Sequence, residues 1–149
     1  MRNLSLTYDK YRTMVIGMRR RGKITDALQL PTEAELEILN ILWARGPSTV
    51  RDVHEASSKS TGYTTVLKQM QVMAEKGLLE RSEKFRSHVY APRVAKGQTQ
   101  QRLARNLVQR AFDGSAKNLV LGALSAQKVS AAELKEIRQM LDEFEKGAR

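Results

Sequence analysis

The sequence predicts a mainly α-helical protein with a small β-wing: a winged helix-turn-helix followed by a C-terminal helical dimerisation region. Between Pro31 and Pro92, local signals follow the order helix, short strand, helix, turn, helix and hairpin, which is the order of a winged helix-turn-helix. From Ala95 onward, apolar residues recur at the spacing of amphipathic helices. These observations divide the chain into an N-terminal arm at 1–30, a winged-helix domain at 31–93 and a helical dimerisation region at 94–149.

The composition indicates a polyanionic partner. The chain has a net charge of +10 and a pI near 10.2, and such an excess favours nucleic acid. No apolar run approaches the ~20 residues that a membrane span requires, and the N-terminus lacks the apolar core of a signal peptide. We therefore expect a cytoplasmic protein without direct membrane insertion. The lack of cysteine excludes disulfides, thiol catalysis and thiolate metal sites.

Residues 1–30 form a strongly basic segment, with seven Lys or Arg residues against two Asp residues. We expect a flexible arm that lies outside the folded domain. A basic tail of this kind also suits contacts with phosphate groups, so the function of the arm is left open between these two interpretations.

Two short helices are expected before the main candidate helix. The first begins after Thr32, because Thr32 and Glu35 form a capping box, and it ends at Gly46. After a brief strand, Ser48 is expected to cap the second helix, which covers roughly residues 49–58.

The segment from Gly62 to Gly77 is the candidate recognition helix. At 100° per residue, one of its sides is apolar and carries Tyr63, Val66, Leu67, Met70, Met73 and Ala74. The opposite side carries Thr64, Thr65, Lys68, Gln71 and Val72. A face of hydroxyl, amine and amide groups suits the DNA major groove. The alternative is an amphipathic helix whose outer face meets water, and the surrounding elements favour recognition.

Base contacts are predicted from Thr64, Thr65 and Lys68, with Val72 against a thymine methyl group. Tyr63 is expected to pack its ring inward and to turn its hydroxyl group to a phosphate. Backbone contacts are expected from the N-terminus of the second helix, where they come from Ser48, Thr49 and Arg51.

A β-hairpin is expected after Gly77, with strands at 78–81 and 88–91. Lys84 and Arg86 stand at its tip, where we predict contacts with phosphates or the minor groove. The alternative for these two cations is a solvated hairpin tip.

The C-terminal region is expected to form three amphipathic helices. The first covers Gln98 to Phe112, and the last follows Ser130, which is paired with Glu133 as a capping box. One small winged domain offers little surface to cover three apolar stripes, so we expect the stripes to join two subunits; a compact bundle within one chain is the alternative. The predicted interface residues are Leu103, Leu107, Leu119, Val120, Ile137, Leu141 and Phe144.

Catalysis finds little support in the sequence. His54 and His88 are the only histidines and belong to separate elements, and no Ser-His-Asp pattern, metal-ligand spacing or glycine-rich phosphate loop is present. We therefore expect a protein that is not an enzyme and has no metal site or cofactor. Non-specific nucleic-acid binding is the main alternative to sequence-specific recognition, and a winged helix used for protein contacts is a third interpretation.

Several runs together resemble a known family. They are E-A-E-L-E-I-L-N-I-L-W over 33–43, S-T-V-R-D-V over 48–53, G-Y-T-T-V over 62–66, E-K-G-L-L over 75–79 and H-V-Y-A-P over 88–92. With S-A-K-N-L-V-L over 115–121 and the final helix, they resemble the penicillinase-repressor (BlaI/MecI) family of bacterial transcriptional regulators. The resemblance covers roughly residues 30–146.

The resemblance implies a homodimeric, sequence-specific repressor that binds operator DNA of dyad symmetry. In the best-known members, a membrane-bound sensor metalloprotease triggers cleavage within the dimerisation region, and transcription starts when the dimer falls apart. The aligned bond here is Asn106–Leu107, where Leu replaces the aromatic residue of those relatives. Relatives often have Thr in place of Lys68 and Arg in place of Val72, which predicts a different operator preference for this chain. The paired cysteines of a copper-sensing branch are absent.

Overall fold

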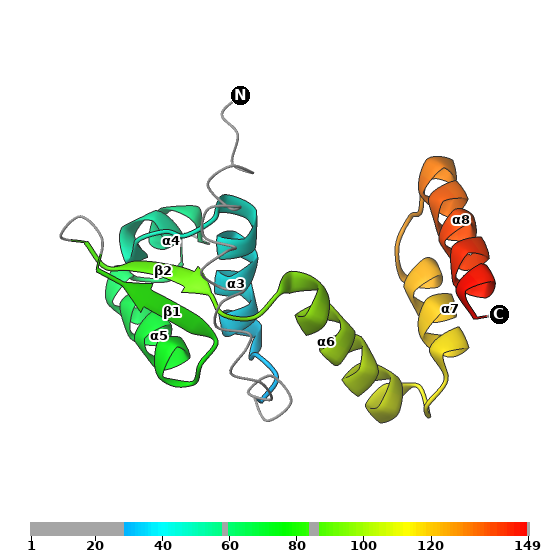
Figure 1. Ribbon diagram of the computed structural model, residues 1–149, viewed down its shortest axis with the longest axis horizontal. Helices are drawn as coiled ribbons and strands as arrows, with labels where there is room; N and C mark the ends of the chain where they lie inside the picture. Colours follow the sequence, from blue (N-terminus) through cyan, green and yellow to red (C-terminus); the bar gives the residue numbers. More distant parts are fainter. Residues whose placement is uncertain (1–28, 58–59, 84–86, 149) are drawn as a thin grey trace. The chain divides into compact units, whose positions relative to one another are not determined.

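The computed structural model describes residues 29–57, 60–83 and 87–148 (Figure 1). Residues 1–28 of the predicted arm, and Lys84 and Arg86 of the predicted hairpin tip, lie outside the described residues. The chain divides into two compact units between Leu103 and Ala104, ten residues after the predicted boundary at 93/94. Buried residues extend past that boundary, to Val94 and Thr99. The two units are described separately below.

The first unit contains α3 (Glu33–Arg45), α4 (Val50–Ala56) and α5 (Tyr63–Glu75). The capping box at the start of α3 is confirmed in both directions: the Glu35 amide donates to Thr32 Oγ1 at 3.2 Å, and the Thr32 amide donates to Glu35 Oε1 at 3.0 Å. The helix ends where Gly46 adopts φ 87°, a conformation that favours glycine. The two local signals thus fix both ends of α3.

The second helix begins one residue later than predicted, and its N-cap is Thr49 rather than Ser48. Ser48 forms an antiparallel bridge with Tyr90, with its amide 3.0 Å from the Tyr90 carbonyl oxygen. The extended backbone that this pairing requires moves the cap to Thr49. Thr49 and Asp52 then form a reciprocal capping box, with Asp52 at the N3 position.

Gly77 closes α5 as predicted. It has φ 85°, and its amide donates to the Ala74 carbonyl at 3.2 Å while the Leu78 amide donates to the Met73 carbonyl at 2.9 Å. These two bonds form a Schellman motif, which needs a left-handed residue at the position after the C-cap. The chain therefore turns sharply from the helix into the hairpin.

The hairpin consists of β1 (Leu79–Ser82) and β2 (Val89–Pro92), paired antiparallel. Both strands begin one residue later than predicted. Pro92 belongs to β2 and lies opposite Leu79, at the end of the ladder, a position that tolerates the missing amide hydrogen of proline. Together with the bridge at Ser48, these elements complete a winged helix-turn-helix.

The core of the first unit draws residues from α3, α4, α5 and both strands. Trp43 packs against this core and fixes the segment that follows β2 to α3, because its Nε1 donates to the Val94 carbonyl oxygen at 3.1 Å. The buried apolar residues are Ile38, Leu39, Leu42, Val50, Val53, Val66, Met70, Met73, Leu78, Leu79, Tyr90 and Val94. The core thus fixes α5 against its neighbours along one side only.

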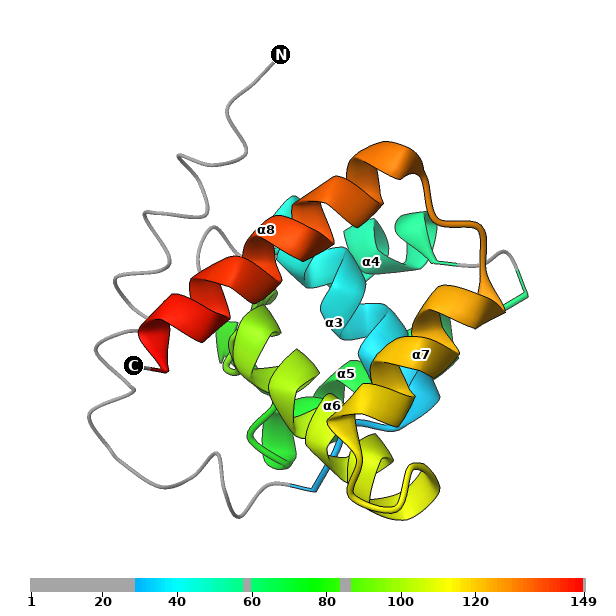
Figure 2. The same cartoon turned by 90° about the vertical axis from the view of Figure 1, so that its right-hand side faces the viewer.

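Helix α6 (Lys96–Ala111) crosses the division between the units, and α7 (Ala116–Ala126) and α8 (Ala131–Gly147) complete the second unit. Asp113 and Gly114 have φ of 51° and 77°, which ends α6 at the predicted break. A short connection, residues 127–130, joins α7 to α8 (Figures 1 and 2). Among the described residues, no helix combines the length and apolarity needed to cross a bilayer.

Candidate nucleic-acid interface

Helix α5 has one buried side and one exposed side. Val66, Met70 and Met73 are at most 1% exposed, and their i, i+4, i+7 spacing forms a single stripe against the core. Thr64 and Lys68, on the opposite side, are exposed. The helix is therefore held by its inner stripe and leaves polar side chains available to a partner.

Tyr63 does not pack inward as predicted. Its side chain is 46% exposed, and its ring lies edge-on to His54, with centroids 5.9 Å apart and planes at 87°. His54 is held in turn by a 2.9 Å contact between Nε2 and the Thr61 carbonyl oxygen. Because Tyr63 is the first residue of α5, it lies beyond the core stripe and meets α4 instead.

Val72 is half-buried, so it is less available to a thymine methyl group than predicted. It lines a hollow between the outer side of α5 and the first turn of α3. The residues around this hollow are Thr32, Glu35, Thr64, Thr65, Lys68, Gln69, Val72 and Lys76. The tertiary structure thus places part of the predicted reading face beside a neighbouring helix.

Glu35 and Lys76 form an ion pair that joins the start of α3 to the end of α5. Lys76 Nζ lies 3.1 Å from Glu35 Oε2, and the Glu35 side chain is only 8% exposed. Burial alone would raise the pKa of Glu35, but hydrogen bonds from Thr32 and Lys76 and the charge of Lys76 together lower that pKa below its usual value. The pair was not predicted from the sequence, since its partners are 41 residues apart.

Replacing Glu35 with Gln is expected to lower the stability of the first unit by about 1–3 kcal/mol at neutral pH, because Lys76 loses its charged partner. A carboxyl group with a lowered folded pKa stabilises the fold above its unfolded value of 4.5, and the contribution disappears as pH falls through the folded pKa. The difference in Tm between wild type and E35Q should therefore shrink below about pH 4.5. Glu33→Gln, which removes an exposed charge from the same turn, is the control; a difference that stays constant with pH would contradict this account.

Ser48 is not placed to contact DNA. Its side chain is buried, its hydroxyl donates to the Gly46 carbonyl oxygen at 2.8 Å, and its amide donates to the Tyr90 carbonyl oxygen. The hydroxyl group is thus used at the end of α3 and the amide in the pairing with β2. Neither donor of Ser48 is free for the predicted contact with a phosphate.

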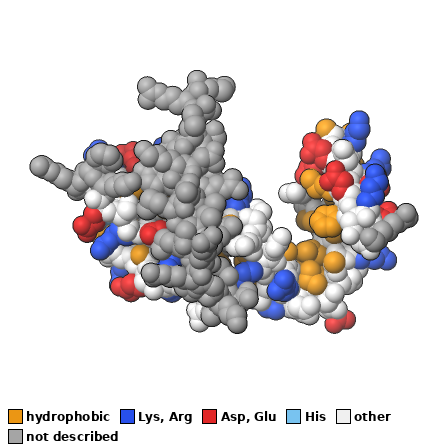
Figure 3. Space-filling model, viewed as in Figure 1, with side chains coloured by type: hydrophobic (Ala, Val, Ile, Leu, Met, Phe, Trp, Pro, Cys, Tyr) orange, Lys and Arg blue, Asp and Glu red, His pale blue; other side chains and the backbone are white. Residues whose placement is uncertain are grey.

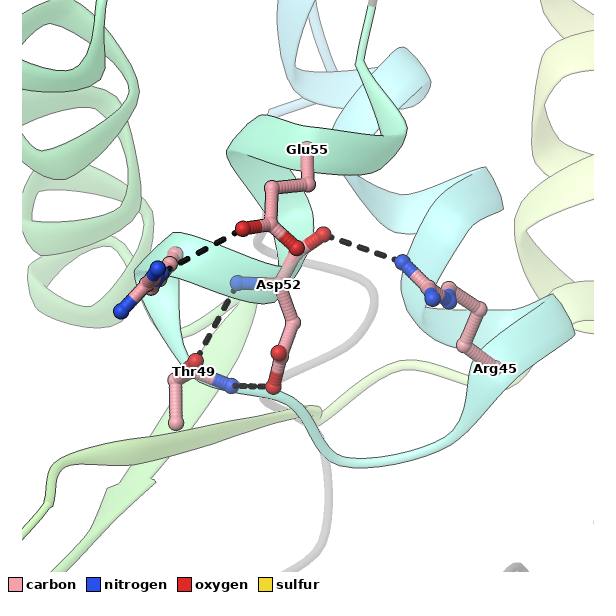
Figure 4. A network of polar contacts seen from close by, with 5 residues as sticks. Arg45, Thr49, Asp52 and Glu55 are labelled. Atoms are coloured by element: carbon pink, nitrogen blue, oxygen red, sulfur yellow. Dashed lines mark hydrogen bonds and ion pairs between the residues drawn. The ribbon is translucent and has the colours of Figure 1, made fainter.

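A network of hydrogen bonds and an ion pair surrounds the N-terminus of α4 (Figure 4). The Thr49 amide donates to Asp52 Oδ2 at 3.1 Å, and hydrogen bonds from Thr49 lower the pKa of the Asp52 carboxyl group. Arg45 Nη1 donates to the Asp52 carbonyl oxygen at 3.0 Å. Arg51 is exposed and lies 3.3 Å from Glu55, an exposed pair of little energetic weight. Arg51 thus remains available for a phosphate, whereas the Thr49 amide is occupied.

The C-terminal helices expose most of their predicted interface. No residue of α7 or α8 is buried, and Figure 3 shows hydrophobic side chains on the surface of these helices. Leu103, Leu119 and Ile137 are half-buried. The exposed predicted residues are Leu107 at 39%, Val120 at 45%, Leu141 at 57% and Phe144 at 78%; Leu121 of α7 and Met140 of α8 are also exposed, at 60% and 54%.

The Asn106–Leu107 bond, predicted as a possible cleavage bond, lies inside α6. Asn106 is half-buried and Leu107 is partly exposed.

In residues 29–57, 60–83 and 87–148, no group of three or more His, Asp or Glu side chains is placed to hold a metal ion.

Comparison with known proteins gives consistent matches. The family model described as "Penicillinase repressor" matches residues 31–143. The "Transcriptional regulator BlaI" of Mycobacterium tuberculosis is 32% identical over 118 residues, which cover 77% of this chain and 85% of the relative. The "Penicillinase repressor" of Bacillus licheniformis is 24% identical over 114 residues, covering 75% and 89% of the two chains.

Two further matches are more distant. The "Methicillin resistance regulatory protein MecI" of Staphylococcus aureus is 20% identical over 113 residues, covering 74% of this chain and 92% of the relative. The solution structure of monomeric Bacillus licheniformis BlaI with the blaP half-operator is 21% identical, with a TM-score of 0.41, and the match covers 47% of this chain and 90% of that chain. From the family match over residues 31–143 and the identity with the mycobacterial regulator, we conclude that the chain belongs to the penicillinase-repressor family, a family of transcriptional repressors and not of enzymes.

Proposed function

We propose that the chain is a homodimeric, sequence-specific DNA-binding repressor that reads its operator with α5. The observation that carries this proposal is the division of α5 into a fully buried stripe, at Val66, Met70 and Met73, and an exposed polar side with Thr64 and Lys68. A rigidly held helix with base-reading side chains outward suits the major groove. Membership of a repressor family and the net charge of +10 support the same partner.

The exposed apolar surface of the C-terminal helices supports a homodimer. Large exposed apolar patches are typical of protein interfaces, and a second copy of the chain offers a matching surface under two-fold symmetry. Such a dimer would present two copies of α5 to DNA. The operator should then contain two half-sites related by a dyad, spaced by one or more helical turns of DNA.

We further propose that loss of the dimer relieves repression. The Asn106–Leu107 bond follows the first compact unit, so cleavage there would separate the winged helix from α7 and α8. Because the bond lies within a helix, α6 must open locally before a protease can cut it. The resemblance to the best-known family members assigns the cut to a membrane-bound sensor metalloprotease or to a step that follows it.

The mass of the chain recovered from induced and uninduced cells tests this switch. A fragment that ends at Asn106 after induction would support cleavage at that bond. An intact chain in fully derepressed cells would refute it.

Footprinting on the promoter of the chain's own operon tests the main proposal. We expect two protected half-sites, and binding that is tighter than to scrambled DNA by ~10³-fold or more. The rival function is non-specific nucleic-acid binding, which the net charge of +10 favours. It predicts uniform affinity across sequences with a steep dependence on salt. A footprint that covers the promoter evenly would favour this rival.

A further inference from the structure

One ridge of α5 combines exposure with base-reading chemistry. Thr64, Lys68 and Gln71 are all exposed, and their i, i+4, i+7 spacing keeps them within an arc of about 60° at 3.6 residues per turn. Gln71 has no part in the hollow beside α3, although its two neighbours on the ridge, like Thr65, Gln69 and Val72, help to line that hollow. Within the described part of the chain, the side-chain carboxamide of Gln71 forms no hydrogen bond.

From this placement we propose that Gln71 is a specificity-determining residue that reads an adenine in each operator half-site. The inference rests on the proposed function of α5 and adds a residue to it. A carboxamide presents one donor and one acceptor group side by side, which match adenine N7 and the N6 amino group in the major groove. Gln71 thus replaces half-buried Val72 as the second reading position on this helix, after Lys68.

The geometry of the ridge also predicts the order of the bases. Lys68 and Gln71 are three residues apart, a rise of about 4.5 Å along the helix. Successive bases on one strand are about 3.4 Å apart along the DNA axis. A lysine at this position donates to guanine O6 and N7, so the half-site should contain a guanine and an adenine separated by no more than about two base pairs.

The test is base-by-base competition with every single substitution in one half-site. For Gln71→Ala in the full-length chain, we expect discrimination at one A·T pair to fall by about 5- to 150-fold, with the preferences at other positions retained. Gln69→Ala is the matched control, because Gln69 is the same residue type, two positions away, and half-buried beside α3.

The outcomes separate this inference from the function on which it rests. If the wild-type chain shows no preference for any sequence, both the proposed function and the role of Gln71 are refuted. If the wild type favours a dyad and Gln71→Ala keeps the whole base profile, or Gln69→Ala loses the same base, only the inference about Gln71 is refuted.

Discussion

Replacing Phe144 with Asp is expected to weaken binding to the full operator by ~10²–10⁴-fold. Phe144 is 78% exposed on α8, and Ile137 lies two turns earlier on the same stripe. A carboxylate at either position would lose its water in an apolar interface. The free energy of this desolvation exceeds the free energy that burial of the original apolar side chain contributes to the dimer. The subunits should then separate, and each winged helix would bind its half-site without the benefit of its tethered partner.

Sedimentation and gel-shift measurements check this prediction on the same samples. Phe144→Asp and Ile137→Asp should both be monomers, with an unchanged affinity for an isolated half-site and a large loss on the full operator. Gln139→Asp adds the same charge to an exposed position on the other side of α8 and should remain dimeric. A stable monomer with full operator affinity would rule out the dimer as the source of tight binding.

A chain that ends at Asn106 should behave like the Phe144→Asp variant. It keeps the first compact unit and loses α7 and α8. Equal affinities of the two proteins for full and half operators would link dimer loss to the proposed cleavage. A truncated chain that still binds the full operator as tightly as wild type would break that link.

Replacing Lys68 with Ala is expected to cost about 1–3 kcal/mol of discrimination at one G·C pair of each half-site. Lys68 is exposed at the centre of the outward side of α5, where its ammonium group can donate to guanine O6 and N7. The dimer carries two such residues, so the loss on a full operator should approach twice that on a half-site for independent contacts.

The control for Lys68 is Lys117→Ala, which removes the same charge from an exposed position on α7. Competition binding with operator and scrambled DNA should show a specific loss only for Lys68→Ala. Lys68→Thr introduces the residue that relatives often carry and should change which base is preferred. An equal loss on all sequences would assign Lys68 to the phosphate backbone instead.

Local signals in the sequence predict most of the secondary structure. Thr32 with Glu35, Gly46 and Gly77 each act through hydrogen bonds or backbone angles within a few residues, so they can be recognised without knowledge of the fold. The buried stripe of α5 follows equally directly from the spacing of Val66 and Met70. The order of these elements predicts the winged helix, and the motifs predict the family.

Tertiary structure decided which side chains remain available. Ser48 was expected to cap α4 and hold a phosphate, but pairing with Tyr90, 42 residues later, buries it. Tyr63 meets His54 instead of the core, and Val72 is half-buried beside α3. Helical periodicity places a residue on a face of its own helix only, whereas the packing of neighbouring helices determines how much of that face a partner can reach. For this reason the sequence alone determined that α5 has a polar outer side, and only the fold showed that Val72 is half-buried beside α3 while Gln71 is exposed and lies outside that hollow.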